Sequence, residues 1–317
     1  MRIAVVGPGA LGCLFATRLF SAADKHDDSI TLIDHRPERA ASLNQQGIVL
    51  ESTAGTETFS IPVLHDLTTI PPVDVLFSCV KSYDLQDSLQ FIQPLLKPET
   101  LFIFLQNGIS HLQYNDAGKL GATPVFATSS EGATALGPGH VRHAGSGHTY
   151  LGFLSKQTNQ ADERLQCLLQ RLQKSGISCS TTEDIHARIW AKLFINVGIN
   201  GLTVLKNCSN GELLDTSSTR DTLKVLVREA KAVACAQGVT IFDDPIEATL
   251  AVCKSTASNI SSMLQDIRKG RPTEIDAING AISRIAKEYG IPTPENDALI
   301  RKIKEITLAT EFGSEKK

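Results

Sequence analysis

Short apolar runs alternate with amphipathic stretches through the first half of the chain. The runs share a richness in β-branched and aromatic side chains, and they are residues 2–6, 29–34, 73–80, 101–105 and 124–128. Nearly unbroken apolar runs of this length are typical of parallel strands that are buried on both faces. Helical spacing between them, clearest at 13–20 and 85–96, predicts an α/β domain with a doubly wound parallel sheet.

Other segments depart from this alternation of apolar runs and amphipathic stretches. Residues 47–63 are predicted to form a small hairpin insertion, 139–152 a glycine-rich antiparallel hairpin, and 161–175 a helix. From about residue 183 the strand pattern disappears and long helical patterns replace it. We therefore expect a domain boundary within 176–184, with a sheet domain at 1–180 and an all-helical domain at 181–317.

A glycine motif opens the chain directly after the first apolar run. It consists of Gly7, Pro8, Gly9, Ala10, Leu11 and Gly12. Between a strand and a helix, G-x-G-x-x-G allows a tight turn, close approach of the backbone to a pyrophosphate, and close packing of helix on strand. The helix that follows presents its N-terminal amides to the anion. These six residues are predicted to bind a dinucleotide, which identifies the sheet domain as Rossmann-type.

The end of the second predicted strand bears on the choice of cofactor. Asp34 stands where a carboxylate accepts a hydrogen bond from a ribose 2′-hydroxyl, which favours NAD. Arg36 and Arg39 follow closely, and a guanidinium at this place can bind a 2′-phosphate, which favours NADP. Alternatively, residues 36–39 only begin a solvated helix. These residues leave the choice open.

A polar stripe marks the predicted helix at 190–200. Lys192, Asn196 and Asn200 recur every four residues and so stay within a sector of about 80°. The residues around them are mainly apolar, and buried amides and ammonium groups need partners. One such residue is usually satisfied by neighbouring backbone, whereas three in register indicate a ligand site.

Further polar residues stand at predicted strand and helix ends. Lys81 and Asn107 follow two of the buried runs, where ligand contacts collect in such sheets. Each has a simpler interpretation, as a solvated lysine and a turn-forming Asn-Gly pair. Ser262 and Asp266 share a helix face. Residues 273–276 are expected to begin another helix, in whose first turn the negative charge of Glu274 would interact favourably with the helix dipole.

Composition excludes several classes of protein. The 317 residues are 42% hydrophobic and 21% charged with a net charge of −3, so neither nucleic acid nor an anionic membrane is an expected partner. The seven cysteines form no C-x-x-C pair, and no histidine cluster has ligand spacing, so no metal site is expected. Scattered thiols favour a cytoplasmic location. The apolar N-terminus is interrupted by glycines and a proline, unlike a signal peptide.

At the level of motifs, the chain resembles the ketopantoate reductase family over essentially its whole length. The matching segments are 7–12 (GPGALG), 80–83 (VKSY), 106–108 (QNG), 190–200 (WAKLFINVGIN), 207–213 (NCSNGEL), 259–266 (NISSMLQD) and 273–280 (TEIDAING). The resemblance implies a Rossmann domain followed by a helical domain. It also implies NADPH-dependent reduction of 2-dehydropantoate, a branched 2-keto acid, to the 2-hydroxy acid pantoate in pantothenate biosynthesis. The sequence leaves the oligomeric state open, with a homodimer as one of the alternatives.

The resemblance also implies roles for individual residues. Lys192 matches the catalytic lysine, and Glu274 matches an acid close to that lysine and to the cofactor. The implied substrate contacts are Asn107, Asn196, Asn200, Asn210 and Ser262. The implied cofactor contacts outside the glycine motif are Asp34, Arg36, Lys81, Asn107, Ala133 and Glu274. The chain departs from the family in having Asp34-His35 where many members have arginine, which leaves NAD as an alternative to NADP.

The expected chemistry requires no metal. Hydride transfer to a ketone develops negative charge on the carbonyl oxygen, which needs a positioned donor. Lys192 can stabilise that charge and deliver the proton, and partial burial would make it a stronger acid. Two alternatives remain: an NAD-dependent 2-hydroxyacid dehydrogenase of the same superfamily, which Asp34 favours, and a non-catalytic nucleotide-sensing protein, which would have no need for Lys192.

Overall fold

The computed structural model describes residues 1–24, 26–68 and 70–314. The chain divides into two compact units, which are described separately below. The first comprises residues 1–106 and 111–185, and the second comprises residues 107–110 and 186–317. Within the described part of the chain, no helix is both long enough and apolar enough to cross a membrane.

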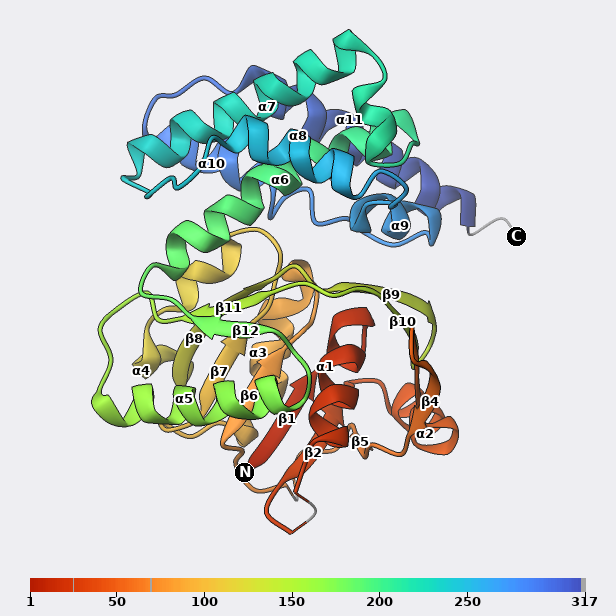
Figure 1. Cartoon of the computed structure of the whole chain (residues 1–317), viewed down its shortest axis with the longest axis vertical. Coiled ribbons are helices and arrows are strands. Elements are labelled where there is room, and N and C mark those ends of the chain that lie inside the picture. The colour runs from red at the N-terminus through yellow and green to blue at the C-terminus, as the bar shows by residue number, and fades with distance from the viewer. Residues whose placement is uncertain (25, 69, 315–317) are drawn as a thin grey trace. The chain divides into compact units, whose positions relative to one another are not determined.

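The first unit is built on an eight-stranded sheet with the order β12-β11-β8-β7-β6-β1-β2-β5 (Figure 1). Its strands are β1 (Arg2–Val6), β2 (Ser29–Ile33), β5 (Val63–Leu64), β6 (Val75–Ser78), β7 (Leu101–Phe104), β8 (Thr123–Ser129), β11 (Thr149–Gly152) and β12 (Cys179–Thr181). The strands from β5 to β8 are parallel, and β11 runs antiparallel to β8. This arrangement confirms the predicted α/β class and the parallel sheet.

The strand register aligns the ends of the three central strands. Val6 pairs with Ile33 on one side and with Ser78 on the other. The residues that follow these strands therefore meet at one edge of the sheet. The edge collects the glycine motif, Asp34 and the segment that leads to Lys81.

Helices cover this sheet. They are α1 (Ala10–Ser21), α2 (Pro37–Gln46), η1 (Ser82–Asp84), α3 (Leu85–Ile92), η2 (Gln93–Leu95), η3 (Ser110–Tyr114), α4 (Ala117–Leu120) and α5 (Asn159–Lys174). The core is apolar and closely packed: Phe15 of α1 and Phe77 of β6 are fully buried, with ring centroids 5.7 Å apart. Burial of such aromatic side chains stabilises helix-on-sheet packing.

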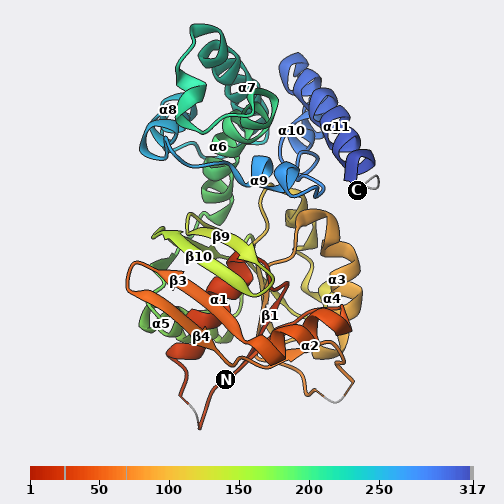
Figure 2. The same cartoon turned by 90° about the vertical axis from the view of Figure 1, so that its right-hand side faces the viewer.

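A second sheet of four strands lies beside α1, with the order β4-β3-β10-β9 (Figure 2). Its strands are β3 (Ile48–Ser52), β4 (Gly55–Phe59), β9 (Gly132–Gly137) and β10 (His140–Gly145). The hairpin predicted within 47–63 is confirmed as β3 and β4. The hairpin predicted at 139–152 is wrong: Gly139, at φ +67°, forms the turn of a β9–β10 hairpin, and 149–152 is a strand of the main sheet.

The second unit is helical. It contains α6 (Ile185–Lys206), η4 (Gly211–Leu214), α7 (Ser217–Ala236), α8 (Pro245–Ser255), α9 (Ser262–Arg268), α10 (Asn279–Glu288) and α11 (Pro294–Ser314). Glycines let its helices approach α6 closely, because a Cβ on Gly198 would lie 2.9 Å from Val227, and one on Gly201 would lie 2.7 Å from Leu299. The helix predicted to begin at 273–276 is wrong, since this segment is a turn and α10 begins at Asn279.

Candidate active site

The polar stripe of α6 combines half-buried and buried side chains. Lys192 and Asn196 are half-buried and Asn200 is buried, while Trp190 and Val197 on the same helix are fully buried. Burial disfavours the ammonium and lowers the pKa of Lys192 to about 8, and the carboxylate of Glu274 opposes this shift. Lys192 is therefore a stronger acid than an ordinary lysine and remains mainly protonated at neutral pH.

Glu274 is held by a turn that lies far from it in sequence. Its side chain is 5% exposed, and its Oε2 accepts a hydrogen bond of 3.1 Å from Nδ2 of Asn107. Gly108 permits this approach: its φ is +79°, and a Cβ there would lie 2.1 Å from the carbonyl oxygen of Ala277. The Asn-Gly pair is thus more than a solvated turn, because it aligns the amide with the carboxylate.

Asn210 and Ser262 occupy other parts of the helical unit. Asn210 is 8% exposed, and its Nδ2 donates a 2.9 Å hydrogen bond to Oγ1 of Thr256. Its Oδ1 is buried and accepts no hydrogen bond from the described residues. Ser262 is an exposed residue in the first turn of α9, on the same helix as the buried Asp266.

Sequence reasoning missed three residues that support this region. Ser261 is buried and caps α9, because its Oγ accepts from the amide of Leu264. Its Oγ also lies 2.6 Å from Oγ1 of Thr203 on α6. Thr256 holds Asn210 as described above. A serine before the N-terminus of a predicted helix is a recognisable capping signal, but its pairing with Thr203 depends on the fold.

The glycine motif in the sheet unit has the geometry that a pyrophosphate requires. Gly7 has a φ of +87°, and a Cβ on Gly12 would lie 2.2 Å from the carbonyl oxygen of Gly7. Gly9 is exposed and stands at the N-cap of the 12-residue helix α1. Pro8 is buried, and Ala10 and Leu11 are half-buried in the first turn. The backbone and helix dipole therefore fit an anionic dinucleotide.

Asp34 lies among arginines at the same sheet edge. Asp34 is 3% exposed, and its Oδ1 accepts from the backbone amide of Arg36 at 3.1 Å and from Nε of that residue at 3.3 Å. Nη1 of Arg39 lies 3.2 Å from Oδ2, and Nη2 of Arg39 donates to the carbonyl oxygen of Pro8. Asp34 is thus neutralised, Arg39 links α2 to the glycine motif, and the Arg36 side chain remains 52% exposed.

The remaining sequence-predicted residues of the sheet unit lie on separate elements. Lys81 follows β6, is half-buried and stands at the N-cap position of η1, where its side chain makes no capping hydrogen bond. Ala133 is a half-buried residue of β9, in the four-stranded sheet. His143 and His140 acquire acidic partners that the sequence did not reveal, with Glu131 at 2.7 Å and Glu51 at 2.8 Å. No group of metal-ligating side chains occurs among the described residues.

Comparison with known proteins covers both units. Residues 3–156 match the model of the family described as "Ketopantoate reductase PanE/ApbA", and residues 184–307 match its C-terminal model. The 2-dehydropantoate 2-reductase of Halobacterium salinarum is 30% identical over 295 residues, which are 93% of this chain and 95% of that protein. The enzyme of the same name from Vibrio cholerae is 29% identical over 96% of this chain and 97% of its own length.

Solved structures give the same relationship. A PanE/ApbA family ketopantoate reductase from Ralstonia eutropha has a TM-score of 0.87 and 27% identity, and the match covers 98% of this chain and 100% of that one. A D-mandelate dehydrogenase in a ternary structure with NADH and anilino(oxo)acetate has the same TM-score and identity, with coverage of 98% and 99%.

The fold and the site together define an oxidoreductase that uses a nicotinamide cofactor. Within that class, both family models match, and together they span most of the chain. The chain belongs to the ketopantoate reductase family.

Proposed function

We propose that this protein reduces 2-dehydropantoate to pantoate with NADPH, and that Lys192 donates the proton. The observation that carries the proposal is a lysine whose pKa is lowered to about 8 beside a carboxylate that Asn107 orients. When bound, the nicotinamide supplies the hydride. The relatives named 2-dehydropantoate 2-reductase support the choice of substrate.

Lys192 has the properties of a general acid for ketone reduction. Its ammonium stabilises the charge that develops on the carbonyl oxygen and then transfers its proton to that oxygen. The lowered pKa brings the acid nearer to operating pH, where proton transfer is most effective. Glu274 keeps a sufficient fraction of the lysine protonated, and Asn107 fixes the direction of the carboxylate.

The amides and Ser262 are proposed to bind the substrate. Asn196 and Asn200 extend the stripe of Lys192 along α6, so they can hold the carboxylate of a keto acid whose carbonyl oxygen is at Lys192. Asn210 is proposed to accept a hydrogen bond from a hydroxyl group of the substrate once its side chain moves to expose Oδ1, which is buried and accepts no hydrogen bond from the described residues. The 4-hydroxyl group of 2-dehydropantoate can donate this hydrogen bond.

The cofactor preference is proposed from the charges around Asp34. Its carboxylate repels a 2′-phosphate, but two guanidinium groups neutralise it. Arg36 is exposed enough to contact the phosphate, and Gly7, Gly9 and Gly12 form the loop for the pyrophosphate. Lys81, Ala133, Asn107 and Glu274 are proposed to complete the cofactor contacts. This arrangement favours NADPH and permits NADH.

A second candidate is an NAD-dependent 2-hydroxyacid dehydrogenase. The structural neighbour that binds NADH is a D-mandelate dehydrogenase, and Asp34 stands where a carboxylate favours NAD. The substrate of such a dehydrogenase would not need a 4-hydroxyl group. A purely nucleotide-sensing role is disfavoured, because it gives no reason to bury the ammonium of Lys192, which costs free energy.

We further propose a cytoplasmic location and a small 2-keto acid as the partner. All seven cysteines are described, and each is a free thiol. Five of them, namely Cys13, Cys79, Cys179, Cys208 and Cys253, have a pKa raised by burial, so these thiols are poorly reactive. Reduced thiols of this kind are typical of proteins in a reducing compartment.

A pair of substrates that differ by one hydroxyl group tests the proposal. The protein should reduce 2-dehydropantoate with a kcat/KM about ten- to hundredfold higher than that for 3,3-dimethyl-2-oxobutanoate, which lacks the hydroxyl. Asn210→Ala should remove most of this difference. Equal efficiencies in the unmodified enzyme, or a preference for benzoylformate, would support the dehydrogenase alternative.

A further inference from the structure

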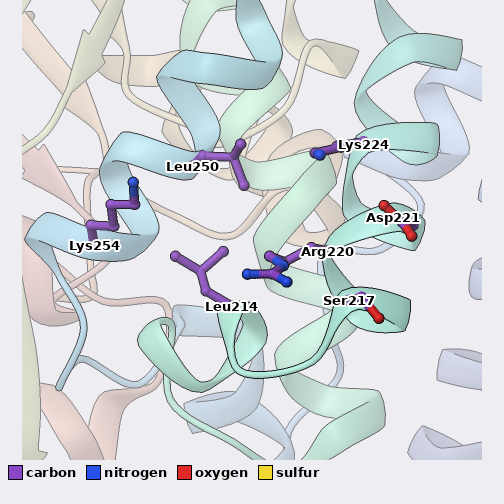
Figure 3. A pocket seen from close by; sticks show the side chains of 7 residues that line it. All are labelled: Leu214, Ser217, Arg220, Asp221, Lys224, Leu250 and Lys254. Carbon is purple, nitrogen blue, oxygen red and sulfur yellow. The ribbon is translucent and has the colours of Figure 1, made fainter.

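A cationic pocket lies in the helical unit between η4, α7 and α8 (Figure 3). Its volume is about 320 Å³, and it is lined by Leu214, Ser217, Arg220, Asp221, Lys224, Leu250 and Lys254. In Figure 3 the guanidinium of Arg220 points toward Leu214, whereas Asp221 and Ser217 point away from it. The pocket is therefore lined by two leucine side chains and by three positively charged side chains, with Lys224 and Lys254 on opposite sides of Leu250.

Positively charged side chains outnumber acidic ones in the lining of this pocket. Among the described residues, no carboxylate forms an ion pair with Arg220, Lys224 or Lys254. The net charge of the lining is +2, since Asp221 is its single acid. The first turn of the 20-residue helix α7 adds the positive end of its dipole. An anion is the ligand that this arrangement favours.

The side chains narrow the chemistry of the anion. The lining carries the guanidinium of Arg220 and the ammonium groups of Lys224 and Lys254, and this charge favours a phosphate dianion over a monoanionic carboxylate. Leu214 and Leu250 offer apolar surface next to the charges, so a ligand that also carries a compact apolar group gains from its burial. The class that fits is a small phosphate monoester with an apolar substituent.

The walls of the pocket are continuous with the segments that hold Asn210. Leu214 ends η4, which begins directly after Asn210, and the pocket residue Lys254 lies two positions before Thr256. Thr256 accepts the hydrogen bond from Asn210. Gly211 donates its amide to the carbonyl oxygen of Ala257, and a Cβ on Gly211 would lie 2.6 Å from the Cβ of Ala257. A displacement of η4 against α8 therefore has to move Asn210.

We infer that this pocket binds a small phosphate monoester and that its occupancy changes the affinity for the keto acid through Asn210. The binding half of the inference, which is that the pocket binds the phosphate monoester, depends on the pocket alone. The coupling half, which is that occupancy of the pocket changes the affinity for the keto acid, rests on the proposed function, because it requires Asn210 to contact the substrate. By linkage, the substrate must change the affinity for the phosphate monoester by the same factor.

Calorimetric titration of the full chain tests the binding half. The probe is phenyl phosphate. Inorganic phosphate, which lacks the apolar group, and benzoate, which lacks the phosphate, are titrated as comparison ligands. Saturating NADP⁺ is present throughout, so that the glycine motif is occupied. Phenyl phosphate should bind at least about fivefold more tightly than inorganic phosphate or benzoate, and added salt should weaken the binding of phenyl phosphate. Equal affinity for phenyl phosphate and benzoate would overturn the choice of a phosphate.

Matched charge variants locate the binding. Arg220→Gln with Lys254→Gln should weaken phenyl phosphate about tenfold or more. Arg228→Gln with Lys287→Gln removes the same charge from exposed positions of α7 and α10 outside the pocket, and it should leave the affinity within about twofold. No binding at millimolar concentration, or equal binding by the double variant, would overturn the inference.

Steady-state kinetics test the coupling half. Saturating phenyl phosphate should change the KM for 2-dehydropantoate at least about threefold with little change in kcat, and the double variant should show no change. Binding without any effect on KM would overturn the coupling and leave the binding half standing. If the protein does not reduce 2-dehydropantoate, calorimetry still decides whether the pocket binds its ligand, so the two failures are distinguishable.

Discussion

The balance between burial and Glu274 at Lys192 makes a quantitative prediction for pH dependence. Burial lowers the pKa of Lys192 from 10.5 to about 8, although the carboxylate of Glu274 opposes it. The difference corresponds to about 3 kcal/mol in favour of the neutral amine. Glu274→Gln removes the opposing charge and keeps the shape of the side chain, so the pKa of Lys192 should fall further, by roughly one pH unit.

The sign follows from the role of the ammonium. Reduction needs the protonated lysine, so kcat/KM for 2-dehydropantoate should be steady near neutral pH and fall as pH rises through about 8. With the pKa lowered to about 7 in Glu274→Gln, the falling limb should move to lower pH, and about half of the lysine would be deprotonated at pH 7. The oxidation of pantoate, which needs the neutral amine as base, should show the opposite dependence.

The assay is the initial rate of NADPH consumption from pH 6 to pH 10 with 2-dehydropantoate well below its KM, so that the rate follows kcat/KM. The midpoint of the falling limb is the informative quantity, because loss of the contact between Asn107 and Glu274 also lowers the absolute rate. Glu288→Gln, at an exposed position of α10, serves as the control and should keep the midpoint near 8. A limb that stays in place in Glu274→Gln, or moves to higher pH, would refute the electrostatic reasoning.

Three further predictions follow from the proposed roles. Lys192→Ala should lower kcat by orders of magnitude with little effect on the Kd of NADPH. The control Lys206→Ala, at the exposed end of the same helix, should keep a kcat near that of the unmodified protein. Similar rates in both variants would exclude Lys192 from the mechanism. Asn200→Ala should raise the KM for the keto acid about tenfold and leave nucleotide binding unchanged in fluorescence titrations; loss of nucleotide binding alone would reassign this helix. Arg36→Ala should lower the kcat/KM for NADPH about tenfold and leave the kcat/KM for NADH unchanged, whereas Asp34→Ala should raise the kcat/KM for NADPH. The reverse pattern would contradict the roles assigned to these two residues.

The parallel strands were predictable because burial on both faces leaves an unbroken apolar run, as in β6 and β7. The short edge strand β12 has no such run, and it was missed. The hairpin predicted at 139–152 was misplaced because glycines at 145 and 147 resemble a turn, although the chain there passes between two sheets. Alternation alone does not show which sheet a strand joins.

Parts of the candidate site within one helix were predictable, because helical spacing fixes the relation of Lys192 to Asn200. The family resemblance pointed to Glu274, but its contact with Asn107 spans 167 positions and no local pattern contains it. The pairing of Thr203 with Ser261 depends in the same way on the packing of α6 against α9. Long-range contacts of this kind are set by tertiary structure rather than by local spacing.

The central claim is that the unmodified protein reduces 2-dehydropantoate with NADPH. Its most direct test is the ratio of kcat/KM values for NADPH and NADH, measured with 2-dehydropantoate as the substrate under identical conditions. Because Arg36 is available to the 2′-phosphate and Asp34 is neutralised, the account predicts a ratio above one. A ratio below one, or no turnover of 2-dehydropantoate with either cofactor, would contradict it.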